Sequence, residues 1–367
     1  MKASARFLYV LSLAAFCVAC GGGSSGGGGA VETVGEVPPP DLPPPPGPLS
    51  DGDYTVIQLD LLPGHRRANA NDINDNGQIV GWSGAENQTA VLWTIDGAGV
   101  ATVQDLGTLP GGTFSIAFGI NNLGQIVGST DGALGSRRPF IWTADDGMRD
   151  LGVPVGLVGG SAQSINDAGQ VVGAFITSEA NTGFSERGTF GIWIVDATGA
   201  TTDEQNFGTL GGTGAVAYDN NIHGNIAGDI WFGGSQTGFF WSEQGGVVEI
   251  NNTNEALGIN DNDTSVGVGA NHNNEGYVWS TSAGLVEVPE GILMEINNAG
   301  QAVGRADVDS TLQQAFIWEN GEVKLLPMHE NRDFSWAMSI NEAGWVVGWS
   351  TDVPGNEFAN LWIPDQP

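Results

Sequence analysis

Short runs of β-branched and aromatic residues, separated by Gly, Asn and Asp, follow one another from residue 54 to residue 363. Runs of this length and composition are typical of strands, and the Gly-containing breaks are typical of tight turns. The pattern contains no helical periodicity of useful length. Over residues 113–152, for example, the pattern predicts four strands at 113–121, 125–130, 139–142 and 148–152.

This four-strand pattern recurs seven times at intervals of roughly 45 residues. Each copy carries a phrase related to Ile-Asn-x-x-Gly-Gln-Val-Val-Gly, with a Trp about twenty residues later. The phrases begin at Ile73, Ile120, Ile165, Asn220, Ile259, Ile296 and Ile340. The matching indoles are Trp93, Trp142, Trp193, Trp241, Trp279, Trp318 and Trp362, and we expect them to fill the core between repeats. Periods near 45 with four short strands are typical of a β-propeller.

The two ends of the repeat region complement each other. The last copy stops after its third strand, at 360–363, and an unmatched strand of the fourth type precedes the first copy, at 54–60. One N-terminal strand plus three C-terminal strands would complete a blade and remove exposed edges. The sequence therefore predicts an all-β, seven-bladed β-propeller over 53–364, closed by that N-terminal strand. An open β-solenoid and two smaller propellers are the alternatives.

The N-terminal 52 residues differ in composition from the rest. Residues 1–19 combine Lys2 and Arg6 with an apolar run too short to span a bilayer, which is typical of a signal peptide. The run ends at Cys20, and small residues before a Cys predict a lipoprotein leader in which Cys20 receives the lipid. An ordinary secretory signal is the alternative. Residues 20–52, rich in Gly, Ser and Pro, predict an extended tether. We therefore expect an outer-membrane lipoprotein whose folded part faces the periplasm or the cell surface.

Charge and cysteine usage limit the partners. The formal net charge is −31, and both Cys residues, Cys17 and Cys20, lie in the leader, so no disulfide is expected in the folded part. So acidic a chain repels nucleic acid and anionic lipid. We expect a monomer that touches a membrane only through its lipid.

The repeat also resembles a known group. The string Asp105-Leu106-Gly107-Thr108-Leu109-Pro110-Gly111-Gly112, followed by Gly-Ile-Asn and Gly-Gln-Ile-Val-Gly, is similar to the HAF-repeat extracellular proteins of bacteria. The resemblance covers residues 54–363. The His-Ala-Phe triplet that names the group is absent, and its nearest equivalent is Gln314-Ala315-Phe316. Membership implies secretion and implies little about activity.

Signatures of catalysis and metal binding are sparse. The sequence has no nucleophile elbow, zinc-protease motif or phosphate-binding loop, and its four His residues are far apart. The segment from Asp72 to Gly77 places oxygen ligands as a calcium loop does. In the other copies these ligands drop out while Asn-x-x-Gly persists, which favours a hairpin turn. We therefore expect no cofactor, with calcium as the alternative.

Cations are unevenly distributed over the predicted faces. In a meander the first-to-second and third-to-fourth turns share one face, which we name the turn face, and the other connections share the loop face. Most Arg and His residues fall on the loop face, and the turn face is acidic. Where the first and last blades meet, we expect Trp82 beside Trp349, near an anion- or sugar-binding group. That group comprises Trp82, Trp336, Trp349, His65, Arg66, Arg67, His329 and Arg332. The alternative is that the Arg residues pair with Glu330 and Asp333 and that the Trp residues pack the core.

The sequence thus favours a non-catalytic binding scaffold with a protein or glycan partner on the loop face. The longest connection, residues 174–189, is the first candidate contact. The alternative is a hydrolase or lyase acting on an extracellular polysaccharide or other polymer, with acids such as Asp229, Asp307 or Asp309 in its loops.

Overall fold

The computed structural model describes residues 54–365, apart from 85–86, 97–98, 134–136, 177–187, 271–274, 290, 309–311 and 353–354. Over these residues the fold is all-β, with strands and turns and no helix, as predicted. No helix in the described part is long and apolar enough to cross a membrane. The predicted signal peptide (1–19), Cys20 and the tether (20–52) lie outside the described residues.

The described strands fall into units of four antiparallel strands: six are consecutive meanders, and a seventh combines β26, β27 and β28 with β1. The first strands are β2 (Arg67–Ile73), β6 (Ser115–Ile120), β10 (Gly159–Ile165), β14 (Gly214–Asn220), β18 (Thr253–Ile259), β22 (Gly291–Ile296) and β26 (Phe334–Ile340). The second strands are β3 (Gln78–Gly84), β7 (Ile126–Asp131), β11 (Gln170–Ile176), β15 (Ile226–Trp231), β19 (Ser265–Gly269), β23 (Ala302–Asp307) and β27 (Val346–Thr351).

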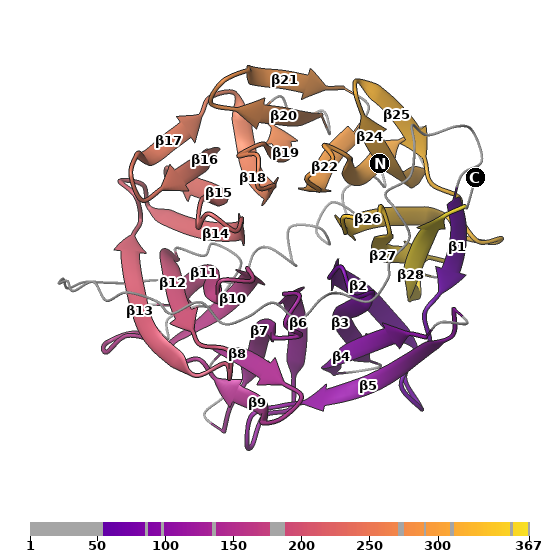
Figure 1. The fold of residues 1–367 in the computed structure, drawn as a ribbon, viewed down its shortest axis with the longest axis horizontal. Coiled ribbons are helices and arrows are strands. Elements are labelled where there is room, and N and C mark those ends of the chain that lie inside the picture. Colours follow the sequence, from indigo (N-terminus) through magenta and orange to yellow (C-terminus); the bar gives the residue numbers. More distant parts are fainter. Residues whose placement is uncertain are drawn as a thin grey trace, which may run out of the picture.

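The outer half of each unit holds the remaining two strands. The third strands are β4 (Gln88–Ile95), β8 (Arg137–Thr143), β12 (Thr189–Val195), β16 (Gln236–Ser242), β20 (Gly276–Ser280), β24 (Gln313–Glu319) and β28 (Glu357–Pro364). The fourth strands are β5 (Ala101–Gly107), β9 (Gly147–Asp150), β13 (Thr201–Gly208), β17 (Gly246–Ile250), β21 (Gly284–Val288), β25 (Glu322–Leu325) and, for the seventh unit, β1 (Tyr54–Gln58). Figure 1 shows the units arranged in a ring, with first strands innermost and fourth strands on the perimeter.

Units one to five are separate four-stranded sheets, and the last two units share one eight-stranded sheet. A single parallel bridge, between Gln313 and Phe334, joins β24 of unit six to β26 of unit seven. Within unit seven, β1 pairs with β28 in an antiparallel register running from Tyr54↔Pro364 to Gln58↔Asn360. The two ends of the described chain therefore belong to the same sheet.

The Gly that ends each repeated phrase lies where the second strand crosses closely over the first. A Cβ on Gly81 would meet the carbonyl oxygen of Asn69 at 2.0 Å, and one on Gly348 would meet that of Trp336 at 1.9 Å. The other five units show the same approach, so no larger residue fits. The first strand of every unit also contains a register shift, such as that between Ala70 and Asp72, which turns its inner end toward the axis.

The hydrophobic core lies between adjacent sheets. One cluster, for example, joins Trp93 of unit one to Val347 and Leu361 of unit seven. The repeated indoles pack into these clusters as predicted: Trp93, Trp193 and Trp362 are fully buried, and Trp142 and Trp279 nearly so. Trp241 and Trp318 are partly buried against the same kind of cluster. Trp93 also donates a hydrogen bond to the Asp60 carbonyl at 2.7 Å, just beyond β1.

Candidate functional site

The Asn of each repeated phrase is buried in a turn that links its unit to the next. In Asn74, for example, Oδ1 accepts the backbone N–H groups of Asn76 and Gln78, at 3.1 and 3.0 Å. The Asp72–Gly77 segment thus contains a hairpin turn, as the repeated Asn-x-x-Gly pattern indicated. Nδ2 of Asn74 is left to donate outward, and it bonds the carbonyl of Asn121 in unit two at 2.9 Å.

This outward bond recurs in every unit. Together the seven side chains form a circuit that we call the Asn circuit, with N···O distances of 2.7–3.2 Å. Its members are Asn74, Asn121, Asn166, Asn221, Asn260, Asn297 and Asn341. The last bond runs from Asn341 back to the Asn74 carbonyl, so the circuit returns to its start.

The residue after each Asn forms a second layer, which we call the rim. Its members are Asp75, Asn122, Asp167, Ile222, Asp261, Asn298 and Glu342. Each rim side chain with an oxygen accepts the backbone N–H of the preceding unit's rim residue, at 2.7–3.0 Å. Ile222 has no acceptor, so the bond from Asp167 is missing and the rim is interrupted between units three and four.

The residue before each repeated Ile lies one level deeper. These deep positions are Asp72, Gly119, Ser164, Asp219, Gly258, Glu295 and Ser339. Asp72 accepts bonds from the Ser339 hydroxyl at 2.7 Å, the Ile120 N–H at 2.8 Å and its neighbour Ile73 at 2.8 Å. This one carboxyl therefore joins units seven, one and two. Asp219 joins units three, four and five in the same way, through Ser164 and Ile259.

Burial changes the acidity of the deep carboxyls. Removal from water raises the pKa of Asp72 to about 7, although its three hydrogen bonds oppose the shift. The same cause raises the pKa of Asp219 to about 6. Burial and the charge of Asp219 raise the pKa of Glu295 well above its usual value. At the rim, burial also raises the pKa of Glu342. Burial therefore favours the protonated form of these deep carboxyl groups relative to carboxyl groups in water.

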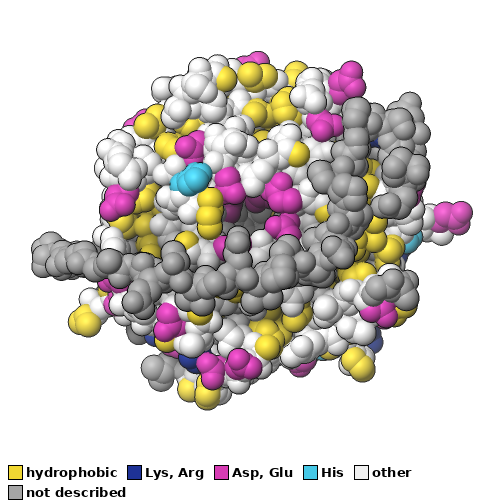
Figure 2. All heavy atoms as spheres, viewed as in Figure 1, with side chains coloured by type: hydrophobic (Ala, Val, Ile, Leu, Met, Phe, Trp, Pro, Cys, Tyr) yellow, Lys and Arg dark blue, Asp and Glu magenta, His cyan; other side chains and the backbone are white. Residues whose placement is uncertain are grey.

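The rim and deep layers line a cavity of about 250 Å³ at the centre of the turn face. Figure 2 shows acidic side chains around this central hollow. The lining includes no Lys, Arg or His. It includes seven carboxyl groups, those of Asp72, Asp75, Asp167, Asp219, Asp261, Glu295 and Glu342. Within the described residues, no three His, Cys, Asp or Glu side chains are placed so as to hold a metal ion. The cavity is thus an acidic, open pocket whose oxygen atoms are held in place by hydrogen bonds.

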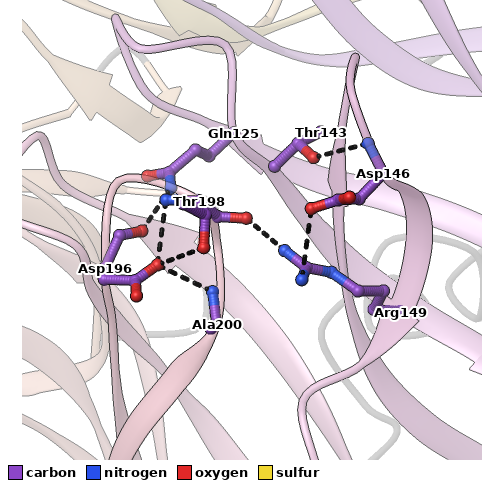
Figure 3. Close-up of polar contacts among 7 residues, drawn as sticks. All are labelled: Gln125, Thr143, Asp146, Arg149, Asp196, Thr198 and Ala200. Atoms are coloured by element: carbon purple, nitrogen blue, oxygen red, sulfur yellow. Dashed lines mark hydrogen bonds and ion pairs between the residues drawn. The ribbon is translucent and has the colours of Figure 1, made fainter.

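Farther from the axis, polar contacts also tie neighbouring units together (Figure 3). Gln125 of unit two donates from Nε2 to the Asp196 carbonyl of unit three at 2.8 Å. Arg149 forms an ion pair with Asp146 at 3.3 Å and donates to the Thr198 carbonyl. Asp196 in turn holds its own turn through the hydroxyl and N–H of Thr198. Arg149 is therefore engaged in a link between units rather than presented to a ligand.

The three indoles predicted to bind a ligand are buried. Trp82, Trp336 and Trp349 are exposed by only 5%, 5% and 8%. Trp349 packs on Trp336 of its own unit at 5.0 Å between ring centroids, where the sequence had suggested Trp82 as its neighbour. The guanidinium of Arg305, from unit six, covers Trp336 at 4.6 Å. In this conformation the indoles offer no open face for stacking.

The Arg and His residues of the predicted binding group contact different neighbours and do not gather in one site. Arg332 donates to Gln58 at 2.8 Å and its guanidinium lies 3.7 Å above the Phe358 ring, so its contacts differ from the expected pairs with Glu330 or Asp333. His329 has a lowered pKa because of burial and the nearby Arg332. His65 Nδ1 lies 3.0 Å from the Ser83 hydroxyl. Arg67 is partly buried near Glu357, and Arg66 is exposed.

The acids nominated for the enzymatic alternative are not free in a cleft. Asp229 is fully buried, and Asp307 pairs with Arg305 at 3.1 Å. Asp309 and most of the 174–189 connection lie outside the described residues. The cavity lies on the turn face, whereas the sequence pattern pointed to the loop face. Its signal was present as acids on either side of the repeated Ile-Asn.

No family model and no curated protein sequence matches this chain. Among solved structures, it resembles the β-propeller domain of the Trilobed protease from Pyrococcus furiosus, described as having an open velcro topology. The TM-score is 0.54 at 11% identity, over 81% of this chain and 94% of that one. It also resembles an acylaminoacyl peptidase bound to Z-Gly-Gly-Phe-chloromethyl ketone, with TM-score 0.56, 10% identity and coverage of 85% and 54%.

A third likeness is to the Pyrococcus horikoshii acylaminoacyl peptidase, with TM-score 0.54, 11% identity and coverage of 83% and 52%. The chain spans about half the length of these two peptidases. At such identities the comparisons define the fold, which is that of the β-propellers, and leave activity to be argued from the site.

Proposed function

We propose that the protein is a closed, seven-bladed propeller that binds a partner at the cavity on its turn face and does not transform it. Each unit is one blade, and the single bridge between β24 and β26 is a contact between blades six and seven. The pairing of β1 with β28 and the return of the Asn circuit to Asn74 support closure. A propeller closed by strand pairing and side-chain hydrogen bonds is a rigid scaffold for a binding site.

The observation that carries the proposal is the acidic cavity at the axis. Seven carboxyl groups converge there, and its lining holds no positive charge. Carboxylates fixed by backbone N–H groups are pre-organised to receive an ammonium or guanidinium group. Ile222 (42% exposed) and Leu123 (61% exposed) add apolar surface on the same face. The best fit is a protein partner that inserts a basic side chain into the cavity.

The predicted leader supports a proposal for the place of the protein in the cell. We propose export, acylation of Cys20 and attachment to the outer membrane, with residues 20–52 as a spacer. Mass spectrometry of the N-terminal peptide should find lipid on wild type and on Cys17→Ser, and none on Cys20→Ser. An unmodified wild-type peptide would contradict the anchor while leaving the binding site untouched.

Calorimetry with a tetralysine peptide at low salt tests the cavity directly. The double variant Asp75→Asn/Glu342→Gln should weaken binding at least tenfold, because it removes two rim charges while keeping acceptor oxygens. The matched control Asp203→Asn/Glu249→Gln removes two exposed charges from β13 and β17 and should change affinity less than twofold.

A third variant distinguishes the two faces. Arg66→Ala/Arg332→Ala alters the loop face and should leave tetralysine binding unchanged. Screening the three variants against glycan and protein arrays then identifies the face that natural partners use. Loss of partner binding only in the Arg66→Ala/Arg332→Ala variant would overturn the turn-face assignment.

A further inference from the structure

Each junction between neighbouring units contains one equivalent pair of positions, on the loop-face side of the repeated turns. The second strand of one unit supplies the residue after the close-packed Gly, and the first strand of the next unit supplies its partner. Ala174 packs on Val216 at the third junction, and Arg305 covers Trp336 at the sixth. At the first, Trp82 and Ile116 occupy these positions, and at the fifth, Val268 and Ile292. The third junction is thus filled by an apolar contact and the sixth by a cation–aromatic contact, and the first and fifth hold aromatic or aliphatic side chains at these positions.

The fourth junction differs, because both positions are acids. Asp229, on β15 of unit four, is 0% exposed. Its partner position holds Glu255, on β18 of unit five, which is partly buried. Burial is the largest cause of the raised pKa of Asp229, and repulsion from the charge of Glu255 is the second. Two carboxyl groups thus face each other across an interface that the other units fill with apolar, aromatic or polar uncharged side chains, or with Arg305.

The surroundings of this pair supply hydrogen-bond donors but no positive charge. Trp231 Nε1 and the Tyr218 hydroxyl donate to Asp229, while Oδ1 of Asp229 is buried without a partner. Gln236 Nε2 donates to Glu255 at 2.7 Å. Tyr277, on β20, donates to the Glu255 carbonyl at 3.2 Å. The elements packed around the pair are β14, β15, β16, β18, β19, β20 and β22, and these strands contain no Lys, Arg or His. Their other carboxyl groups are Asp219 on β14 and Glu295 on β22.

Two buried carboxylates without a counter-ion repel each other and lose hydration, so they are stable together only when a proton remains between them. We propose that Asp229 and Glu255 form a proton-sharing pair that makes the junction between units four and five open more readily as pH rises. The unpaired Oδ1 of Asp229 is the acceptor or donor available for the shared proton. This inference is independent of the cavity on the turn face.

The direction of the effect follows from the acidities. Burial and, after it, the charge of Glu255 raise the pKa of Asp229 well above its usual value. Burial also raises the pKa of Glu255, although the hydrogen bond from Gln236 opposes that shift. A carboxyl whose folded pKa is raised contributes stability that is complete below its unfolded pKa, near 4, and is lost as pH rises through the folded pKa. The junction is therefore tightest in acid and weakest in alkali.

Thermal unfolding of the full chain between pH 5 and pH 9 tests the pair. Asp72 and Asp219 also titrate, so the informative quantity is the difference between wild type and Asp229→Asn at each pH. We expect Asp229→Asn to match wild type within about 2 °C at pH 5 and to exceed its melting temperature by about 4 °C or more at pH 9. Glu255→Gln should behave alike, and it serves if Asp229→Asn fails to fold. Asp203→Asn, at an exposed site, is the control.

Two outcomes would overturn the proposal. Parallel melting curves for wild type and both variants at all pH values would mean that the pair does not titrate with folding. A rise in the wild-type melting temperature at pH 9 on adding calcium, absent in Asp229→Asn, would assign the pair to a cation instead. As a local readout, the hydrogen-exchange protection of β15 and β18 amides should fall between pH 6 and pH 9 in wild type, relative to the same amides in Asp229→Asn.

Discussion

The Asn circuit and the junction positions are both seven-membered rings, and they use the repeat in opposite ways. The circuit has the same residue in every unit, and each Asn makes the same bonds to its own turn and to the next unit. The junctions have the same backbone geometry but hold residues as different as Asp229, Arg305 and Trp349. Identical side chains therefore build the frame, and differing side chains give individual sites their chemistry.

Breaking the circuit should have the largest effect. Asn297→Ala removes a buried side chain that accepts from Gln301 N–H and donates to the Asn341 carbonyl. Because these backbone groups remain buried without partners, we expect a loss of about 3 kcal/mol in unfolding free energy by urea denaturation. Asn251→Ala, at an exposed turn, should cost less than about 0.5 kcal/mol. Equal losses would show that the circuit adds no stability.

The second largest effect is expected at a deep position. These positions hold an acid, Gly or Ser depending on the unit. With the folded pKa of Asp72 raised to about 7, its contribution to stability is complete below pH 4 and is lost as pH rises through 7. Asp72→Asn cannot titrate. The unfolding free energy of wild type should therefore fall relative to this variant by about 2 kcal/mol between pH 5 and pH 8. A constant difference between the two proteins would contradict the raised pKa.

The sixth junction, which contains Arg305 instead of two acids, should tolerate replacement of its buried side chain by one of similar volume. Arg305 is buried at the sixth junction, where it covers Trp336 and pairs with Asp307. Arg305→Met keeps the volume and the contact with the indole while removing a buried charge, so stability should stay within about 1 kcal/mol of wild type. Arg305→Ala leaves a void and should cost about 2 kcal/mol. If Met proves as costly as Ala, the charge itself stabilises the junction.

The smallest effect concerns the gap in the rim. Ile222→Asn supplies the missing acceptor for the Asp167 N–H and replaces an exposed apolar side chain. We expect a gain of about 0.5–1 kcal/mol. The control is Leu123→Asn, at the next turn position of unit two, which adds no bond to the rim and should leave stability unchanged. A gain in both variants would assign the effect to lower exposed apolar surface.

The fold could be read from the sequence because periodic patterns determine it. The spacing of the phrase and its Trp predicted the four-stranded units, the buried indoles and, to within a few residues, strands such as β7 and β9. The Gly that ends each phrase is required because a side chain there would clash with the backbone of the first strand, and this requirement is the same in every copy. These features depend on local composition and on burial repeated seven times, which a single sequence displays directly.

The cavity was harder to predict, because it depends on residues that meet only at the axis. Asp72, Asp219 and Glu295 are more than 70 residues apart in sequence and converge through the register shift in the first strands. The expected Trp82–Trp349 contact failed for a related reason. Junction partners come from a second strand and the next first strand, so the two second-strand indoles belong to different junctions. Geometry of that kind cannot be read from spacing alone.

The pairing of β1 with β28 has a mechanical consequence. Any pull transmitted through the residues before Tyr54 enters the fold at β1, whose strand partner is β28, aided by the Tyr54 hydroxyl bond to Gly344 and by buried Leu59. Tension on the N-terminal segment is therefore borne first by a five-residue ladder, and the rest of the ring is shielded while that ladder holds. Separation of β1 from β28 would remove the fourth strand of unit seven, so we expect this ladder to limit the force that the fold withstands.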